Sequence, residues 1–191
     1  MNFDAYRGLK PARLPSLVIL DRDGVINHDS DAYIKSADEW VPIKGSIQAI
    51  ARLYRNGIKI AVATNQSGLA RGLFDEATLK QIHEKMLGEI RAAGGNLAGI
   101  FYCPHGPEEG CRCRKPDVGL ILQIAEQLQI DPLGIPLIGD AARDIQAASS
   151  AGCQPVLVKT GKGSATLDSG LLDPAIPVFE DLSAFVDFWL D

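Results

Sequence analysis

The fold is decided by a short stretch that reads Leu17-Val-Ile-Leu-Asp21-Arg-Asp23-Gly-Val. Four strand-forming apolar residues, bounded by polar ones, predict a buried central strand over residues 17–20. Side chains alternate along an extended chain, so Asp21 and Asp23 leave the end of this strand on the same side. Two close carboxylates repel each other, and a bound cation keeps both charged at the lowest cost. A solvated strand-to-loop turn is the competing interpretation, because Asp and Gly are common turn residues.

The composition is typical of one globular domain. The chain has 191 residues, of which 46% are hydrophobic and 23% charged, so we interpret residues 1–191 as a single domain with a proper core. The net charge of −5 argues against a nucleic-acid partner. No apolar run is long enough to cross a bilayer, and residues 1–16, expected to be an irregular arm, lack the hydrophobic region of a signal peptide. We therefore expect a cytoplasmic monomer with no membrane partner.

Strands and helices are expected to alternate along the chain. Apolar runs and turn residues predict strands over residues 17–20, 58–63, 99–102, 135–138 and 155–158. Helical spacing and stop signals predict helices over residues 46–56, from Asp75 to the glycines at 94–95, from Asp117 to Leu128, over 142–151 and around 182–189, whereas residues 160–176 are expected to form a mobile surface loop. The alternation predicts an α/β fold with a Rossmann-like, mostly parallel sheet and helices on both faces.

Polar side chains follow three of the expected strands. They are Asp21 with Asp23, Thr64 with Asn65, and Asp140 with Asp144. Ligands of such sheets bind beyond the carboxyl ends of the strands, and buried strands do not need residues of this kind. We interpret Asp21, Asp23 and Asp140 as candidate magnesium ligands, because Mg²⁺ takes a few protein carboxylates and keeps some water. Asp144, one helical turn further along, is expected to orient them.

This combination predicts a phosphoryl-transfer site. Asp21 would attack phosphorus to give an aspartyl-phosphate, and Asp23 would protonate the leaving alkoxide and then deprotonate the attacking water. Thr64 and the backbone amides after it suit an anionic oxygen, and Lys115 can neutralise a phosphate. Arg114 could fork onto a phosphate or sugar oxygen, although an Arg-Lys pair is usually a solvated surface pair. The candidate catalytic residues are Asp21, Asp23, Thr64 and Lys115.

A loop over residues 103–113 predicts a zinc site. It holds three thiols and one imidazole, from Cys103, His105, Cys111 and Cys113. Three thiolates and one His form a common closed tetrahedral zinc set, although the spacing differs from that of zinc fingers. The alternative, cysteines as small buried hydrophobes, fits poorly because the loop has almost no apolar residues, so we assign zinc a structural role. The fourth cysteine, Cys153, is expected to be buried packing.

Four motifs resemble those of the haloacid dehalogenase superfamily of phosphatases. They are Asp21-Arg-Asp-Gly, Thr64-Asn-Gln-Ser-Gly, Arg114-Lys-Pro, and Gly139-Asp with Asp144. Ala-Arg-Gly at 70–72 and the Cys-x-His…Cys-x-Cys loop resemble a branch that acts on sugar bisphosphates and on histidinol phosphate. The resemblance covers about residues 16–160 and implies Mg²⁺, a structural zinc and removal of the 7-phosphate of a heptose 1,7-bisphosphate in nucleotide-activated heptose biosynthesis. Histidinol phosphate or a broader range of phosphomonoesters is the alternative substrate, and a phospholigand-binding module without turnover is a third interpretation.

The resemblance also implies which residues contact the substrate. They are Asp29, Tyr33, Thr64, Asn65, Gln66, Ser67, Arg71, Arg114 and Lys115. The sequence departs from the family at Ala141, where members often carry Lys, and through a C-terminal extension over residues 161–191. The stretch between the first two strand ends is too short for a cap domain, so we expect a capless core whose site is roofed by the loop over residues 27–44 and the zinc loop. His28 is expected to be solvated and His83 to lie at the surface or boundary.

Overall fold

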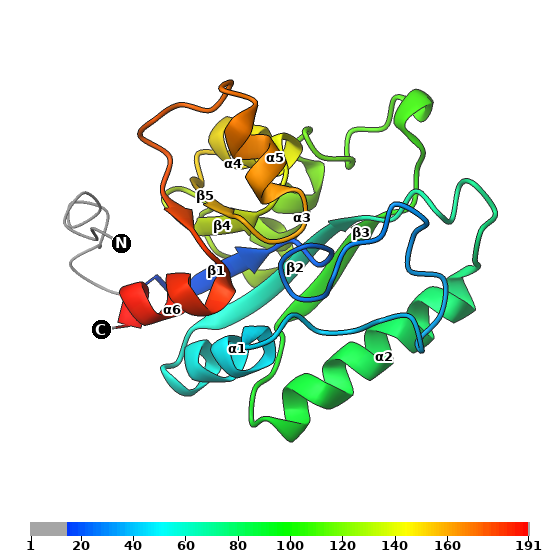
Figure 1. Ribbon diagram of the computed structural model, residues 1–191, viewed down its shortest axis with the longest axis horizontal. Helices are drawn as coiled ribbons and strands as arrows, with labels where there is room; N and C mark the ends of the chain where they lie inside the picture. The colour runs from blue at the N-terminus through cyan, green and yellow to red at the C-terminus, as the bar shows by residue number, and fades with distance from the viewer. Residues whose placement is uncertain (1–14, 191) are drawn as a thin grey trace.

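The computed structural model describes residues 15–190, which form one six-stranded parallel sheet (Figure 1). The strands are β1 (Leu17–Leu20), β2 (Lys59–Asn65), β3 (Gly99–Cys103), β4 (Pro136–Gly139), β5 (Gln154–Val158) and β6 (Val178–Phe179). Their order in the sheet is β3-β2-β1-β4-β5-β6, which is the Rossmann order. The expected α/β fold with a Rossmann-like parallel sheet is therefore confirmed.

Helices cover both faces of this sheet, as expected (Figure 1). The helices are α1 (Ser46–Arg55), α2 (Glu76–Ala92), α3 (Gly119–Leu128), α4 (Ala142–Ser150), α5 (Gly163–Asp168) and α6 (Leu182–Leu190). Because side chains alternate along a strand, Val18 and Leu20 of β1 enter one core with α1, α2 and α6, whereas Leu17 and Ile19 enter the other with α3 and α4. The strand that carries the two carboxylates at its end is thus fixed by apolar packing on both sides.

Two element boundaries differ from expectation in ways that matter for the site. Strand β2 continues to Asn65, so Thr64 and Asn65 belong to the strand rather than to the turn after it. Asp75 caps α2 as predicted, accepting a hydrogen bond from the Thr78 backbone at 2.8 Å. Asp117 does not begin α3, which starts at Gly119. The Gly119 amide instead donates to the carbonyl of Arg112, so the end of the cysteine-rich loop packs directly against the start of this helix.

The expected loop over residues 160–176 is only partly a loop. It contains α5, and it is followed by β6 and by α6, which packs against α1. The polar composition gives α5 no apolar stripe, and the segment is held by hydrogen bonds instead, such as the one from Thr166 Oγ1 to the Asp140 carbonyl at 2.9 Å. Most of the expected N-terminal arm, residues 1–14, lies outside the described residues. None of the described helices is both long and apolar enough to span a membrane.

The connection from β1 to β2 holds a loop and α1 but no cap domain, as expected. Trp40 and Ile26 anchor the loop in the core. From α2, the ammonium group of Lys85 donates to the carbonyls of Ala37 and Trp40, at 2.9 Å each. The loop is therefore tied to the body of the protein while its tip, around Asp29–Tyr33, lies over the carboxyl edge of the sheet.

Candidate active site

A polar pocket of about 210 Å³ lies beyond the carboxyl ends of β1 and β2. The predicted residues that line it are Asp21, Asp23, Asp29, Tyr33, Thr64, Asn65, Gln66, Ser67 and Arg114. Lys115 lies beneath the pocket and is 1% exposed. Arg71 lies outside the lining, with its guanidinium carbon 5.9 Å from the centre of the Tyr33 ring. The structure thus gathers most of the predicted residues around one small cavity.

Three carboxylates, from Asp21, Asp140 and Asp144, form what we call the carboxylate cluster. One oxygen of each lies within 4.8 Å of the others, and all three side chains are buried. Burial and the neighbouring negative charge of Asp144 raise the pKa of Asp21 to about 6, and burial with Asp21 raises the pKa of Asp140 to about 7. Both increases in pKa reflect the free-energy cost of holding buried negative charges close together.

The carboxylate cluster fits a divalent cation. Asp140 Oδ1 is buried and has no hydrogen-bond partner among the described residues, which is costly unless another group satisfies it. The other oxygen, Oδ2, accepts a hydrogen bond from the backbone of Lys162 at 2.8 Å. Gly24, at φ +83°, leaves room for this carboxylate, because a Cβ there would overlap it. The donor set and the open oxygen are those that Mg²⁺ prefers.

Asp23 is not part of the carboxylate cluster, although it was predicted as a magnesium ligand. Its carboxylate faces Arg22, which donates from Nη2 at 2.9 and 3.0 Å. It also accepts hydrogen bonds from Asn27 and Gln66, each at 2.9 Å. Burial alone would raise the pKa of Asp23, but the Arg22 guanidinium and these hydrogen bonds outweigh it and lower the pKa. Asp21 and Asp23 therefore lie in different environments, one crowded by negative charge and one paired with an arginine.

Lys115 holds the nucleophile candidate rather than the pocket surface. Its ammonium group lies 3.0 Å from Asp21 Oδ1 and 2.6 Å from Asp144 Oδ1, and it donates to the Ala63 carbonyl at 2.6 Å. Burial opposes the charged form, but Asp144 and Asp21 raise the pKa of Lys115 overall. An ammonium group has three donors, so these contacts occupy all of them.

Asn65, the last residue of β2, and Gln66, which follows it, line the pocket and also support neighbouring groups. The Asn65 side chain exchanges hydrogen bonds with the backbone of Lys115, at 2.9 and 3.1 Å. Gln66 donates to Thr64 Oγ1 at 2.8 Å as well as to Asp23. Because Thr64 Oγ1 accepts here, its own hydroxyl hydrogen remains available to an anionic oxygen in the pocket.

Sequence reasoning missed three cations in the pocket lining, Arg22, Arg143 and Lys162. Arg143 lies two positions after Ala141, and the Arg143 Nε atom is buried without a hydrogen-bond partner in the described structure. The Lys162 ammonium lies 3.4 Å from Asp29 and 3.5 Å from Asp31. The Lys that family members often carry at the position of Ala141 is thus absent, but positive charge reaches the pocket from α4 and from the segment after β5. A search for basic residues near Asp140 would have found Arg143, whereas no local signal marks Lys162.

The segment Thr160–Thr166 closes one side of the pocket. Thr160 Oγ1 donates to the Gly24 carbonyl at 2.5 Å, and Lys162 and Thr166 bind the side chain and the carbonyl of Asp140. A Cβ on Gly161, at φ +56°, would clash with Asp140 and lie 2.6 Å from Gly24 Cα. Part of the C-terminal extension therefore fixes the position of a candidate metal ligand.

His83 was expected to lie at the surface or boundary, and the structure buries it instead. The His83 side chain is buried on α2, and its Nε2 atom lies 3.2 Å from Arg22 Nη1. Burial and the neighbouring Arg22 lower the pKa of His83 to about 3, so its imidazole is neutral. His28 is exposed, as expected.

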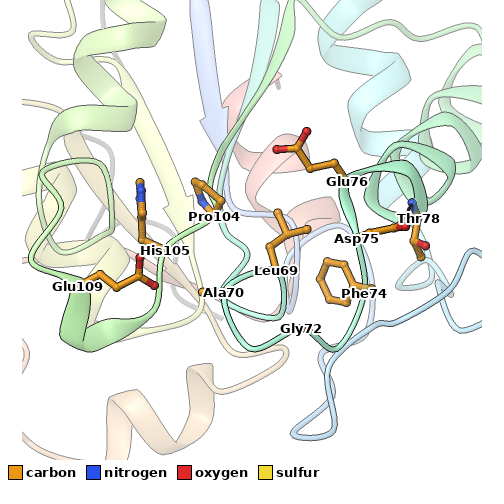
Figure 2. Close-up of a pocket in the computed structure, with 10 residues that line it drawn as sticks. All are labelled: Leu69, Ala70, Gly72, Phe74, Asp75, Glu76, Thr78, Pro104, His105 and Glu109. Carbon is orange, nitrogen blue, oxygen red and sulfur yellow. Dashed lines mark hydrogen bonds between the residues drawn. The ribbon is translucent and has the colours of Figure 1, made fainter.

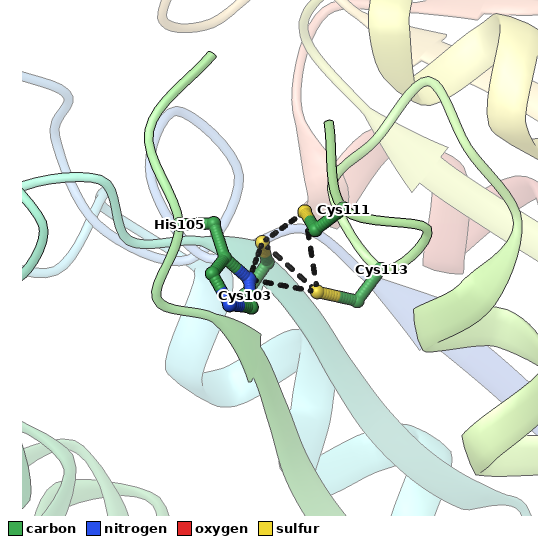
Figure 3. Close-up of side chains that lie close together, drawn as sticks. All are labelled: Cys103, His105, Cys111 and Cys113. Atoms are coloured by element: carbon green, nitrogen blue, oxygen red, sulfur yellow. Dashed lines mark hydrogen bonds between the residues drawn. The ribbon is translucent and has the colours of Figure 1, made fainter. Parts of the chain in front are cut away.

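Four side chains of the cysteine-rich loop, from Cys103, His105, Cys111 and Cys113, converge into what we call the thiol cluster (Figure 3). The sulfur atoms lie 3.1 to 3.5 Å apart, too far for a disulfide bond of about 2.05 Å. His105 turns Nδ1 toward them, at 3.3 Å from Cys113 Sγ and 3.6 Å from Cys103 Sγ. Tetrahedral zinc, with Zn–S bonds of about 2.3 Å, holds sulfurs about 3.8 Å apart, so these donors fit a zinc ion after a small expansion. Cys153 is buried away from them, as expected.

A larger, open hollow of about 930 Å³ lies between the cysteine-rich loop and the start of α2 (Figure 2). Leu69 and Phe74 lie at its centre, with Glu109 on one side and Asp75 and Glu76 on the other. Its charged side chains are acidic, and it contains neither the carboxylate cluster nor Lys115. An anionic substrate is repelled here, so the smaller polar pocket is the candidate active site.

Three features together define a hydrolase of the haloacid dehalogenase class. They are a parallel sheet in this order, a strand that ends in Asp-Arg-Asp-Gly beside a buried lysine, and a second strand that ends in a carboxylate. The family model described as "HAD-hyrolase-like" matches residues 112–185. Among curated proteins, D-glycero-beta-D-manno-heptose-1,7-bisphosphate 7-phosphatase of Bordetella bronchiseptica is 54% identical over 90% of this chain and 96% of that protein. The enzyme of the same name from Pseudomonas putida is also 54% identical, over 88% of this chain and 95% of its own.

Solved structures agree with this assignment. The crystal structure of D,D-heptose 1,7-bisphosphate phosphatase from B. bronchiseptica, complexed with magnesium and phosphate, has a TM-score of 0.90 at 53% identity, over 92% of this chain and 98% of that one. The corresponding enzyme from Burkholderia thailandensis has a TM-score of 0.74 at 43% identity, over 93% and 99% of the two chains. The chain belongs to the family of D-glycero-β-D-manno-heptose-1,7-bisphosphate 7-phosphatases.

Proposed function

We propose that this chain is a Mg²⁺-dependent phosphatase that removes the 7-phosphate of D-glycero-β-D-manno-heptose 1,7-bisphosphate through an aspartyl-phosphate on Asp21. The observation that carries the proposal is the carboxylate cluster beside Lys115, in a chain 54% identical to enzymes that bear this name. The sequence left the anomer open, and the names of the relatives supply the β form. The same assignment places the enzyme in nucleotide-activated heptose biosynthesis.

Asp21 is the proposed nucleophile. The Arg22 amide donates to Asp21 Oδ1 at 2.7 Å, and the Lys115 ammonium pairs with the same oxygen at 3.0 Å, which leaves Oδ2 to attack phosphorus. Mg²⁺, held by Asp21 and Asp140, would draw charge from the phosphoryl oxygens and favour the ionised form of both carboxylates. Lys115 keeps Asp21 in place and offsets its charge while the new P–O bond forms.

Asp23 is the proposed general acid and then the general base. Its side chain lines the pocket and is 19% exposed, so one edge can reach the bridging oxygen of the scissile ester. A sugar alkoxide is a poor leaving group without a proton. The pKa of Asp23 is lowered in the free protein, but the negative charge of a bound phosphate raises it again, so Asp23 takes up a proton with the substrate and delivers it as the ester bond breaks. The carboxylate then removes a proton from the water that attacks the aspartyl-phosphate, which returns both aspartates to their starting forms.

The remaining pocket residues are proposed to bind the substrate. Thr64 donates its hydroxyl hydrogen to a phosphoryl oxygen, while Asn65 supports the backbone of Lys115. Arg114 lines the pocket and donates to the carbonyl of His105 at 3.2 Å, so the cysteine-rich loop sets its position. The cations in the lining oppose the net charge of −5 and suit a substrate with two phosphate groups.

We assign the thiol cluster to structural zinc. Four protein ligands leave no open position for a water, which separates a structural zinc site from a catalytic one. The loop between these ligands has little apolar content to order it, so the metal would supply the missing order. Three thiols in such a cluster remain reduced in the cytoplasm, which is where we place the enzyme, acting as a monomer.

A substrate comparison tests the proposed function. Initial rates are measured on the β and α anomers of the heptose 1,7-bisphosphate and on histidinol phosphate, with Mg²⁺ and with excess chelator. We expect the highest kcat/KM for the β anomer and loss of turnover in chelator. A higher kcat/KM for histidinol phosphate would show that histidinol phosphate is the preferred substrate. Binding of all three compounds without phosphate release would show that the protein is a binding module without turnover.

Substitution of Asp21 tests the mechanism. Asp21→Asn removes the nucleophile but keeps its shape, so we expect kcat to fall by about 10³-fold or more while the circular dichroism spectrum is unchanged. Glu126→Gln, an exposed change on α3, is the control. Full activity of Asp21→Asn would remove the aspartyl-phosphate mechanism.

A further inference from the structure

The residue between the two catalytic aspartates, Arg22, is buried, and each of its three side-chain nitrogen atoms has a hydrogen-bond partner. Its side chain is 1% exposed although it carries a charge. Nε and Nη2 donate to Asp23, and Nη2 also contacts Gln66 Oε1 at 3.1 Å. A guanidinium has a planar, rigid set of donors that matches a carboxylate. Arg22 therefore fixes both the place and the tilt of the Asp23 carboxylate.

The other side of this guanidinium is fixed by α2. Nη1 of Arg22 lies 3.2 Å from Nε2 of His83, a residue 61 positions away in the chain. An arginine can only donate, so Nε2 accepts and the proton of the neutral imidazole is on Nδ1. The His83 ring also packs near Tyr102 of β3, with ring centres 6.0 Å apart. The neutral imidazole of His83 on α2 thus fixes Arg22, and Arg22 in turn fixes the Asp23 carboxylate.

We propose that His83 and Arg22 form a positioning relay that aims the Asp23 carboxylate at the leaving oxygen, with Gln66 as its third support. This inference rests on the proposed function, because it needs Asp23 to be the general acid and base. Neither Arg22 nor His83 transfers a proton in this scheme. Their effect is on geometry: without the Nε2 acceptor, Nη1 is a buried donor without a partner, and the guanidinium must tilt to satisfy it. Asp23 then tilts with it.

The relay is tested by changing His83. His83→Leu keeps a similar volume but removes the acceptor, whereas His83→Gln restores an acceptor through its side-chain carbonyl. Gln81→Leu, an exposed position on the same helix, controls for an added apolar side chain on α2. For the heptose bisphosphate we expect His83→Leu to lower kcat by about 10- to 100-fold, part of the 10²- to 10⁴-fold that general acid–base catalysis contributes, with KM within about twofold of wild type. His83→Gln should regain most of that loss.

An aryl phosphate separates positioning from general damage to the fold. Nitrophenolate leaves without a proton, so its release in the first turnover does not need the acid function of Asp23. In His83→Leu we expect rapid first-turnover release of nitrophenolate at the wild-type rate, followed by slower steady-state turnover, because water activation still needs Asp23. A merely structural role would slow both phases alike.

Arg22→Lys gives a second route to the same result if His83→Leu does not fold. Lysine keeps the charge but loses the fork, so the same split between the sugar substrate and the aryl phosphate is expected. Wild-type kcat on the sugar substrate in His83→Leu, or slowed first-turnover release of nitrophenolate in the variant that folds, would overturn the relay. If Asp23→Asn itself retains full activity on the sugar substrate, the proposed role of Asp23 fails first, and the two failures are thus told apart.

Discussion

The carboxylate cluster and the thiol cluster lie in one small molecule, but the chain supplies their ligands in different ways. Asp21 and Asp140 extend from the ends of adjacent parallel strands that are buried on both faces, and Asp144 is in the first turn of α4. The thiol cluster draws one ligand, Cys103, from the end of β3, whereas the others come from the loop that follows. Strand ends and a helix position the carboxylate cluster, whereas a loop supplies three of the four ligands of the thiol cluster.

This difference predicts what each cluster does without its metal. The apolar cores above and below the sheet hold the carboxylates close together whether or not a cation is present, and the charge repulsion is then stored in the fold. Residues 104–113 of the cysteine-rich loop are only half-buried or exposed, so the conformation of this loop should depend on the metal. We expect metal binding to relieve charge repulsion at the carboxylate cluster and to order the loop at the thiol cluster.

The largest effect on stability is expected from breaking the thiol cluster. Cys111→Ser removes one of its four ligands, so zinc should be lost and the free energy of unfolding should fall by about 3 kcal/mol or more. KM should also rise, because Arg114 is bound to the carbonyl of His105. Zinc content and denaturant unfolding measure the change. Cys153→Ser, outside the cluster, should keep its zinc; an equally stable, zinc-free Cys111→Ser protein would contradict the structural role.

A smaller effect is expected where the segment Thr160–Thr166 supports the carboxylate cluster. Gly161→Ala places a methyl group against Asp140 and Gly24, so Mg²⁺ affinity in calorimetric titration should fall by about tenfold. Gly170→Ala is a matched control, because Gly170 also has a positive φ, +69°, but has nothing within 4 Å of the added Cβ. Both variants bear a similar backbone cost of about 1 kcal/mol, so equal Mg²⁺ affinities would show that Gly161 has no special role.

Removing one charge from the carboxylate cluster should stabilise the protein without metal. Asp140→Asn ends the repulsion with Asp21, and we expect the metal-free protein to gain about 1 kcal/mol. Added Mg²⁺ should then no longer raise the melting temperature, and turnover should be lost. Thermal unfolding with and without Mg²⁺ checks both results, with the exposed Asp168→Asn as control. A less stable metal-free Asp140→Asn would show that the cluster is not strained.

The effect that is smallest at neutral pH belongs to neither cluster and develops only in acid. The pKa of His83 is lowered to about 3 in the fold, against about 6.5 in an unfolded chain. Below pH 6.5 the unfolded state gains a proton that the native state does not, so stability should fall as the pH drops toward 3. His83→Gln should reduce this slope in unfolding measurements across that range, whereas Gln81→Leu, an exposed change on the same helix that removes no titratable group, should not. Identical slopes in wild type and His83→Gln would show that His83 titrates normally.

The strand ends could be predicted from the sequence because their signals are local. An apolar run followed by a carboxylate indicates both a buried strand and its tip, as at Leu17–Asp21 and at Ile135–Asp140. The direction of each side chain could not be predicted. Asp23 follows Asp21 closely, yet its carboxylate is turned away by Arg22, and Lys115 points beneath the pocket at Asp21 instead of into it.

The contacts that sequence reasoning missed are those between distant segments. Lys162 and Thr166 reach Asp140 from a stretch whose Gly, Ser and Thr content is typical of a loop, and His83 reaches Arg22 from the buried side of an amphipathic helix. The helical spacing of the sequence predicts that His83 lies on α2, but it does not predict that this residue reaches Arg22 at the carboxyl end of the sheet. Such contacts depend on how the elements pack, which no single segment specifies.

The closure of the pocket by Thr160–Thr166 has a consequence for how the enzyme is made. A ribosome delivers the chain from its N-terminus, and Asp21 emerges long before the segment that clamps Asp140. A nascent chain can therefore carry the nucleophile and form β1 to β4 while the side of the pocket next to Gly24 is still open. We therefore expect hydrolytic competence late in synthesis: ribosome-bound fragments that end before Thr160 would carry the proposed catalytic carboxylates without a finished pocket.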